Sequence, residues 1–411
     1  MSFQEAGSIW SLKSPICVCT EQHANWSISD KTVAIVGTGA YYPPNRKSAA
    51  DLKDIISKVH ELDSIFNKIL EINDKSMIKT RHFAIPDDHP YWGRPEVPTI
   101  AECDVLFKLY GAPMAETAAK KALDNWGGSM QDITHLVVVT CTNTANPGLD
   151  FHLSQKLGLS RNVHRILLHG IGCAGGVAAL RTANELLLGA AFQAKAGRAL
   201  VVACELTSIY CRTELADIER DHQVNVGVTL FGDGAGALVL SNSIGVTVSE
   251  KESVWNILNA RSTVIKGSEQ CLEYNVHARG YHAVISKDVP SFIRASISQG
   301  FEELIRSTPS LCRDGNNFVP SNYDWALHPG GYGVLVLAEQ ELGLSQHHLR
   351  KSHEVYRTRG NISSVTVLGV IDELAKEDVT SSSARRNVIV CSFGPGMTME
   401  MAVMSRHNHG R

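Results

Sequence analysis

Short apolar runs of the kind that form buried strands recur along this chain, and segments with helical periodicity separate them. The runs of the first half lie at 32–39, 133–139, 199–205 and 231–240, and those of the second half at 255–262, 325–327, 387–396 and 397–404. Strands covered by helices on both faces are continuously apolar rather than alternating. The pattern therefore predicts an α/β fold made of two halves that repeat one arrangement without repeating one sequence.

The domain organisation follows from where the pattern repeats. Residues 1–30 are mixed and aperiodic, so we expect an N-terminal extension there. We place the first half at 31–245 and the second at 246–411. Because no low-complexity segment or flexible linker separates them, one compact, pseudo-symmetric body is expected.

Composition and charge exclude several classes of protein. A hydrophobic content of 44% supports a sizeable core, and a net charge of −3 indicates no nucleic-acid partner. No apolar run is long enough to span a membrane, and no secretory signal precedes the first strand. The ten cysteines have neither the spacing of a zinc site nor the density of a disulfide framework. We therefore expect a cytoplasmic protein without a transmembrane segment and without a metal.

A single cysteine, Cys173, stands where an apolar run ends in a glycine turn and a helical segment begins, in the sequence H-G-I-G-C-A-G-G-V-A-A-L. Unpaired N–H groups at a helix start favour an anion, so this position is expected to lower the pKa of the thiol. Small neighbours leave room for a substrate. The motif alone is equally compatible with a buried structural cysteine.

Two further polar positions fit the chemistry of a thiol nucleophile. His328 follows a short strand, and Asn361 lies in a loop that opens a helix. An imidazole can exchange a proton with a thiol, and both side chains can donate hydrogen bonds to an oxyanion. Each also has a structural explanation, since His328 could bond a loop carbonyl and Asn361 could cap the helix. Spacing alone does not show that the three residues meet.

Several motifs occur together in one order: D-K-S-M-I-K-T-R from Asp74, G-C-A-G-G around Cys173, L-F-G-D-G-A from Leu230, L-H-P-G-G around His328, G-N-I-S-S around Asn361 and S-F-G-P-G-M-T around Gly394. Over roughly residues 30–405 the chain resembles the type III polyketide synthases, the relatives of chalcone synthase. The resemblance implies a duplicated αβαβα thiolase fold and a homodimer.

The resemblance also implies a mechanism. Cys173 would take an acyl group from acyl-CoA, and His328 and Asn361 would orient malonyl-CoA, assist its decarboxylation and stabilise the enolate that attacks the thioester. Repeated extension would precede ring closure. CoA thioesters serve as the substrates, and no separate cofactor or carrier domain is implied.

Positions that differ from the plant enzymes bear on the substrate. Aligning the sequences places Cys211 and Ala283 at two positions where the plant enzymes carry gating phenylalanines, and Asn143 near a cavity threonine. The resemblance also assigns to the cavity Phe231, Ser363, Gly394, Pro395 and Gly396, and to CoA binding Lys68 and Lys75, although Glu71 stands where the plant enzymes have arginine.

Loss of two rings would make room for a long chain, and each buried methylene contributes about 0.8 kcal/mol. We therefore expect a fatty acyl-CoA starter and an alkylpyrone, alkylresorcinol or alkylresorcylic acid product. Three alternatives remain: a ketoacyl-ACP synthase III that catalyses a single condensation, a cysteine hydrolase that releases free acid from acyl-CoA, and an inactive relative that serves as a binding partner.

Overall fold

The computed structural model describes residues 32–247, 250, 253–312, 315–377 and 384–407. The predicted extension at 1–30 lies outside these residues. Residues 32–411 form one compact unit. At its centre, the described residues build a nine-stranded sheet in the order β11-β12-β13-β8-β1-β7-β6-β4-β5.

Eight of the nine strands of this sheet coincide with the apolar runs of the sequence, and the ninth, His164–Leu168, ends just before the glycine turn at Cys173. The nine strands are β1 (Val33–Tyr41), β4 (His135–Val139), β5 (His164–Leu168), β6 (Arg198–Glu205), β7 (Gly234–Ser241), β8 (Trp255–Val264), β11 (Asp324–Leu327), β12 (Asn387–Gly394) and β13 (Thr398–Arg406). Every residue of β6 and β7 is buried, as expected of strands with helices on both faces.

The pairing of the strands repeats once. In the first half β1 is antiparallel to β7, β7 is antiparallel to β6, and β6 is parallel to β4. In the second half β8 is antiparallel to β13, β13 is antiparallel to β12, and β12 is parallel to β11. The antiparallel pair β1–β8 joins the two halves into one sheet. The predicted duplicated α/β architecture is confirmed.

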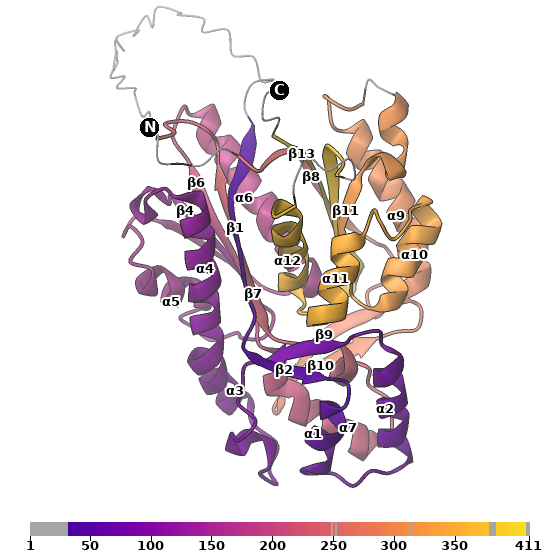
Figure 1. Cartoon of the computed structure of the whole chain (residues 1–411). Coiled ribbons are helices and arrows are strands. Elements are labelled where there is room, and N and C mark those ends of the chain that lie inside the picture. Colours follow the sequence, from indigo (N-terminus) through magenta and orange to yellow (C-terminus); the bar gives the residue numbers. More distant parts are fainter. Residues whose placement is uncertain (1–31, 248–249, 251–252, 313–314, 378–383, 408–411) are drawn as a thin grey trace, which may run out of the picture. The chain divides into compact units, whose positions relative to one another are not determined.

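Helices form a central layer and two outer layers. The central helices α6 (Gly175–Phe192) and α12 (Ser364–Ala375) pack against each other, and Figure 1 shows both in the middle of the molecule. A Cβ at Gly176 would lie 2.3 Å from the Ser364 carbonyl oxygen, so only glycine permits this approach. On the outside, α4 (Ala112–Trp126) covers the first half, and α9 (Val289–Arg306) and α10 (Tyr332–Leu342) cover the second.

Shorter elements gather at one end of the sheet, at the bottom of Figure 1. They are β2 (Asn45–Ser48), β3 (Thr80–Phe83), α1 (Asp51–Ser57), α2 (Ser64–Lys75), α7 (Cys211–Asp221), α8 (Gly227–Leu230), β9 (Leu272–His277) and β10 (Gly280–Ile285). The remaining helices are α3 (Ile100–Leu106), α5 (Leu149–Lys156) and α11 (Arg350–Arg359). No described helix is long and apolar enough to cross a membrane.

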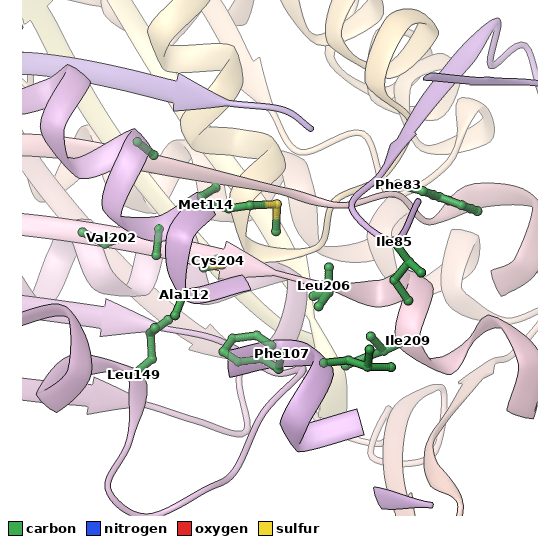
Figure 2. Packing of buried hydrophobic residues seen from close by; sticks show 14 of the residues in the cluster. Phe83, Ile85, Phe107, Ala112, Met114, Leu149, Val202, Cys204, Leu206 and Ile209 are labelled. Atoms are coloured by element: carbon green, nitrogen blue, oxygen red, sulfur yellow. The ribbon is translucent and has the colours of Figure 1, made fainter. Parts of the chain in front are cut away.

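The core of the first half continues towards this end. Figure 2 shows Phe107, Leu206 and Ile209 packed beside Phe83 and Ile85 within one buried cluster. Leu206 directly follows the last residue of β6, and Ile209 lies in the short 3-10 helix Thr207–Tyr210 that comes next. Burial of these side chains, at about 1.5 to 3 kcal/mol each, holds the segment after β6 against β3 and orders the loops that surround the functional site.

Candidate active site

Cys173 lies in a tight turn between β5 and α6, as the sequence predicted. The turn needs glycine at position 172, because φ there is +50° and a Cβ would lie 2.5 Å from Cδ of Pro395. A Cβ on Gly394 would likewise lie 2.3 Å from the Ile171 carbonyl oxygen. The G-P-G loop at the end of β12 therefore packs directly on the turn that carries Cys173. Glycine at positions 172 and 394 permits this contact, and the contact holds the turn in place.

His328 and Asn361 reach the same region from the second half. The N–H of His328 donates to the Cys391 carbonyl in β12 at 2.8 Å, which anchors the residue after β11. The Asn361 amide donates to the Gly330 carbonyl at 3.0 Å, and its oxygen accepts from the Ser363 N–H at 2.8 Å. The Asn361 side chain also hydrogen-bonds Cys173. Asn361 thus links the histidine loop to the cysteine.

Ser363 completes this cluster in a strained conformation. Its φ is +46°, which is unusual for a residue other than glycine. In this conformation the Ser363 hydroxyl lies 3.4 Å from the sulfur of Cys141. The Ser363 side chain also forms a hydrogen bond with Cys173. Backbone strain of this kind typically concentrates at functional sites.

The protonation state of Cys173 differs from the sequence prediction. Burial raises the pKa of the Cys173 thiol to about 11, although hydrogen bonds with Ser363 and Asn361 act in the opposite direction. The predicted lowering is wrong because the sulfur lies inside the protein, where desolvation of the thiolate outweighs the helix start. Burial also lowers the pKa of His328 to about 3, and neither ring nitrogen has a hydrogen-bond partner among the described residues. In the free protein both groups are therefore neutral.

A cavity opens beside Cys173, and its lining is mostly apolar. The predicted residues on its wall are Cys173, Cys211, Phe231, Ala283, Ser363 and Pro395. Phe83, Phe231 and Tyr274 also contribute rings, so aromatic side chains remain in this cavity despite the substitutions at Cys211 and Ala283.

Other predicted residues lie elsewhere. Asn143 does not line the cavity: its amide donates to Asp104 in α3 at 2.8 Å and so faces the protein interior. Lys68 and Lys75 are exposed on α2 and do not line the cavity, although α2 packs against α7 and α8, which do. Gly394 and Gly396 flank Pro395 without reaching the cavity wall themselves.

Sequence reasoning missed a buried polar group behind the cysteine. Glu205, at the end of β6, accepts hydrogen bonds from the N–H of Cys141 at 3.0 Å, from Thr142 Oγ1 at 3.0 Å and from the Ser364 hydroxyl. Burial raises its pKa, and these donors oppose the rise. A signal was present, because Glu205 ends β6 and Cys141 follows the neighbouring parallel strand β4, and sites of α/β sheets lie at these carboxyl ends.

The family models match both halves of the chain. The N-terminal domain of chalcone and stilbene synthases matches residues 21–243, and their C-terminal domain matches residues 256–407. The acylalkylpyrone synthase csyB of Aspergillus oryzae is 45% identical over 379 residues, which are 92% of this chain and 96% of that protein. The type III polyketide synthase pspB of Penicillium soppii is 37% identical over 385 residues, which are 90% of this chain and 96% of that protein.

Solved structures agree with the sequence comparisons. A crystal structure of CsyB complexed with CoA-SH superposes with a TM-score of 0.90 at 46% identity and covers 91% of this chain and 100% of that chain. A type III pentaketide synthase from Neurospora crassa superposes with a TM-score of 0.87 at 35% identity, covering 91% and 100%. The cysteine turn, the histidine and asparagine loops and the duplicated sheet lie within these matches. The chain belongs to the chalcone and stilbene synthase family and is a type III polyketide synthase.

Proposed function

We propose that Cys173 takes a long acyl chain from acyl-CoA, that malonyl-CoA extends this chain, and that the product closes to an alkylpyrone. The observation that carries the proposal is the mostly apolar cavity whose wall contains the Cys173 sulfur. A relative at 45% identity is an acylalkylpyrone synthase, which supports a pyrone rather than a resorcinol.

In the proposed loading step, Cys173 attacks the acyl-CoA carbonyl and CoA leaves as the thiol. His328 is neutral before the reaction and has both ring nitrogens unpartnered among the described residues, so it can accept the thiol proton when the substrate arrives. In the extension step, loss of carbon dioxide from malonyl-CoA leaves an enolate. Donors on His328 and Asn361 stabilise its oxygen, and its carbon attacks the Cys173 thioester.

The cavity supports a long starter. Cys211 and Ala283 are each 6% exposed, and both lie on the cavity wall. Leu272 and Ile285 add apolar surface beside them. Replacing Ala283 by phenylalanine should fill this space and shift the preference towards shorter starters, and Cys211→Phe should do the same. Unchanged selectivity in both variants would contradict the proposed position of the chain.

We propose that Lys68 and Lys75 bind the phosphates of CoA. Both are exposed on α2, one face of which packs against α7 and α8 beside the cavity. They stand two helical turns apart, so both project from similar sides of the helix. A double Lys68→Ala, Lys75→Ala variant should raise KM for acyl-CoA and leave the alkylation rate of Cys173 unchanged. We propose that the reaction uses CoA thioesters as substrates and needs no cofactor and no metal. We also propose a cytoplasmic location.

A homodimer is proposed through the β5 edge of the sheet. No described strand pairs with the outer side of β5, so its backbone groups are available to a second copy. Apolar side chains are exposed nearby on α5 and α6: Phe151 is 38% exposed and Phe192 is 73% exposed. Light scattering should give the mass of a dimer for the wild type and a lower mass for Phe192→Glu. A wild type with the mass of a monomer would contradict the proposal.

The function is tested with a series of starters from acetyl-CoA to stearoyl-CoA, together with isotopically labelled malonyl-CoA. Mass spectrometry should detect labelled alkylpyrones, with the highest kcat/KM for long chains and none from Cys173→Ala. A preference for acetyl-CoA would contradict the long-chain starter. Dependence on an acyl carrier protein would favour the single-condensation alternative, and free acid without label would favour a hydrolase.

A further inference from the structure

Two acidic side chains on the cavity wall, Glu214 and Glu273, have no role in the proposed condensation. Glu273 accepts a hydrogen bond from the Asn275 amide at 3.1 Å. Glu214 lies on α7, is 5% exposed and lines the same cavity as Cys173. No other described residue gives its carboxyl group a hydrogen bond or an ion pair within the distances that define one. The carboxyl oxygens are not fully buried, so they reach the open cavity, where a bound molecule can pair with them.

The fold makes room for this carboxyl group against the cavity. The two oxygens of Glu214 lie 3.0 and 3.2 Å from where a Cβ of Gly227 would stand, so the absent side chain of Gly227 creates the space that they occupy. Arg81 on β3 is the cation on this wall, but its guanidinium donates to the Val228 and Phe231 carbonyls at 2.8 and 2.9 Å. Arg81 is therefore hydrogen-bonded to α8 and to the residue that follows α8 rather than to Glu214.

A second polar group faces the cavity from the opposite element. Tyr274 on β9 stacks on Tyr281 with ring centroids 4.9 Å apart, which fixes its ring. Its hydroxyl has no hydrogen-bond partner among the described residues. Burial raises the pKa of the Tyr274 hydroxyl, and the charges of Cys141, Tyr210 and Glu214 act in the same direction. Tyr274 and Glu214 line the same cavity. The cavity thus presents an acid and a phenol, called here the Glu214–Tyr274 pair, within a mostly apolar wall.

We propose that the Glu214–Tyr274 pair binds an oxygen function, a keto or hydroxyl group, on the acyl chain held in the cavity. The inference rests on the proposed acyl-binding role of this cavity. A plain alkyl chain would expel water from the cavity and leave the Glu214 carboxyl and the Tyr274 hydroxyl without hydrogen bonds. An oxygen atom on the part of the chain beside them would give both groups a hydrogen-bond partner. Burial raises the pKa of Glu214 to about 8, so the carboxyl group keeps its proton at neutral pH and can donate it to a carbonyl.

The oxygen can come from two sources. A starter can already carry it, or the first extension can create it as a keto group. The loading arm of the test separates these: acyl-CoA thioesters of equal length, plain or with one oxo group at successive positions, are incubated without malonyl-CoA. Intact-protein mass spectrometry then follows acylation of Cys173. The turnover arm adds malonyl-CoA to a plain starter and measures the lengths of the products.

Glu214→Leu and Glu214→Gln distinguish binding from structure, because glutamine keeps a donor and an acceptor of the same shape. For each starter length, the rate of Cys173 acylation by the oxo starter is divided by the rate for the plain starter. If the starter supplies the oxygen, Glu214→Leu should lower this ratio about tenfold for one position of the oxo group, and Glu214→Gln should leave the ratio unchanged. If extension supplies it, loading of plain starters should stay unchanged and Glu214→Leu should release shorter products. Tyr274→Phe should act in the same direction.

The matched control is Glu302→Leu on α9, whose side chain is 55% exposed and does not line the cavity. It should match the wild type in both arms. Equal ratios and equal product lengths in the wild type, Glu214→Leu and Glu214→Gln would overturn the inference. The loading arm needs no malonyl-CoA, so this result is distinguishable from a failure of the proposed extension reaction.

Discussion

Replacing Glu214 by glutamine should stabilise the protein at alkaline pH. The carboxyl group is 5% exposed, and burial together with the Asp217 charge raises its pKa to about 8, while Arg81 acts in the opposite direction. Cys211 on the same helix and Tyr274 on β9 also face this region of the cavity wall. Glutamine keeps the shape of the protonated acid and removes the ionisation.

The magnitude follows from linkage between protonation and folding. The folded state holds this proton up to a pH of about 8, whereas the unfolded chain releases it near the ordinary value of 4.5. The folded state therefore binds more protons between these values, and the free energy of unfolding falls as the pH rises through the window. The slope is at most about 1.4 kcal/mol per pH unit, which amounts to at most about 4 kcal/mol between pH 5 and pH 8.

The assay is urea denaturation followed by tryptophan fluorescence at unit steps from pH 5 to pH 9. The wild type should lose stability relative to Glu214→Gln as the pH rises, and the difference should level off above about pH 8. Glu302→Gln, which removes an exposed carboxylate on α9, should run parallel to the wild type. If the wild type and Glu214→Gln curves are parallel across the whole range, the carboxyl group is not held protonated and the reasoning is refuted.

Three further predictions concern the site and its support. Because the pKa of the Cys173 thiol is about 11, its alkylation by iodoacetamide should speed up about tenfold per pH unit from pH 7 to pH 10; a plateau below pH 7 would show a thiolate already present. Gly172→Ala places a Cβ 2.5 Å from Pro395 at a φ of +50°, so we expect kcat to fall at least about tenfold and Tm to drop, both measurable against the wild type. Asp324→Ala removes a fully buried carboxylate that accepts from Arg350 at 2.8 Å, and urea denaturation should show a loss of about 3 to 5 kcal/mol; a loss below about 1 kcal/mol would contradict a stabilising role.

Much of the active site could be predicted because its parts are local. The turn at Cys173, the loop at His328 and the loop at Asn361 each carry glycines and polar residues at a strand end, and short-range backbone rules govern such segments. The structure links Asn361 directly to Cys173 and, through Gly330, to the histidine loop. The two halves were likewise predictable, because burial on both faces makes central strands such as β6 and β7 continuously apolar.

The protonation states were not predictable in the same way. The helix start lowers the pKa of a cysteine thiol that is exposed, whereas burial raises the pKa of the thiol. Only the packing of the folded protein decides which effect is larger. Asn143 shows a similar limit: its position after β4 suggested the cavity, yet its amide turns to Asp104 on α3. Side-chain direction in a loop depends on partners that are distant in the sequence.

The sequence by itself determined the alternation of strands and helices, the repeat of two halves and the candidates for the reactive side chains. Tertiary structure alone decided that the thiol and imidazole are neutral in the free protein and that the cavity contains an unpaired acid at Glu214. The physical reason is range. Periodicity and turn chemistry act over a few residues, whereas desolvation depends on every chain segment that surrounds a group, and α7, α8, β3 and β9 meet around Glu214 only in the folded protein.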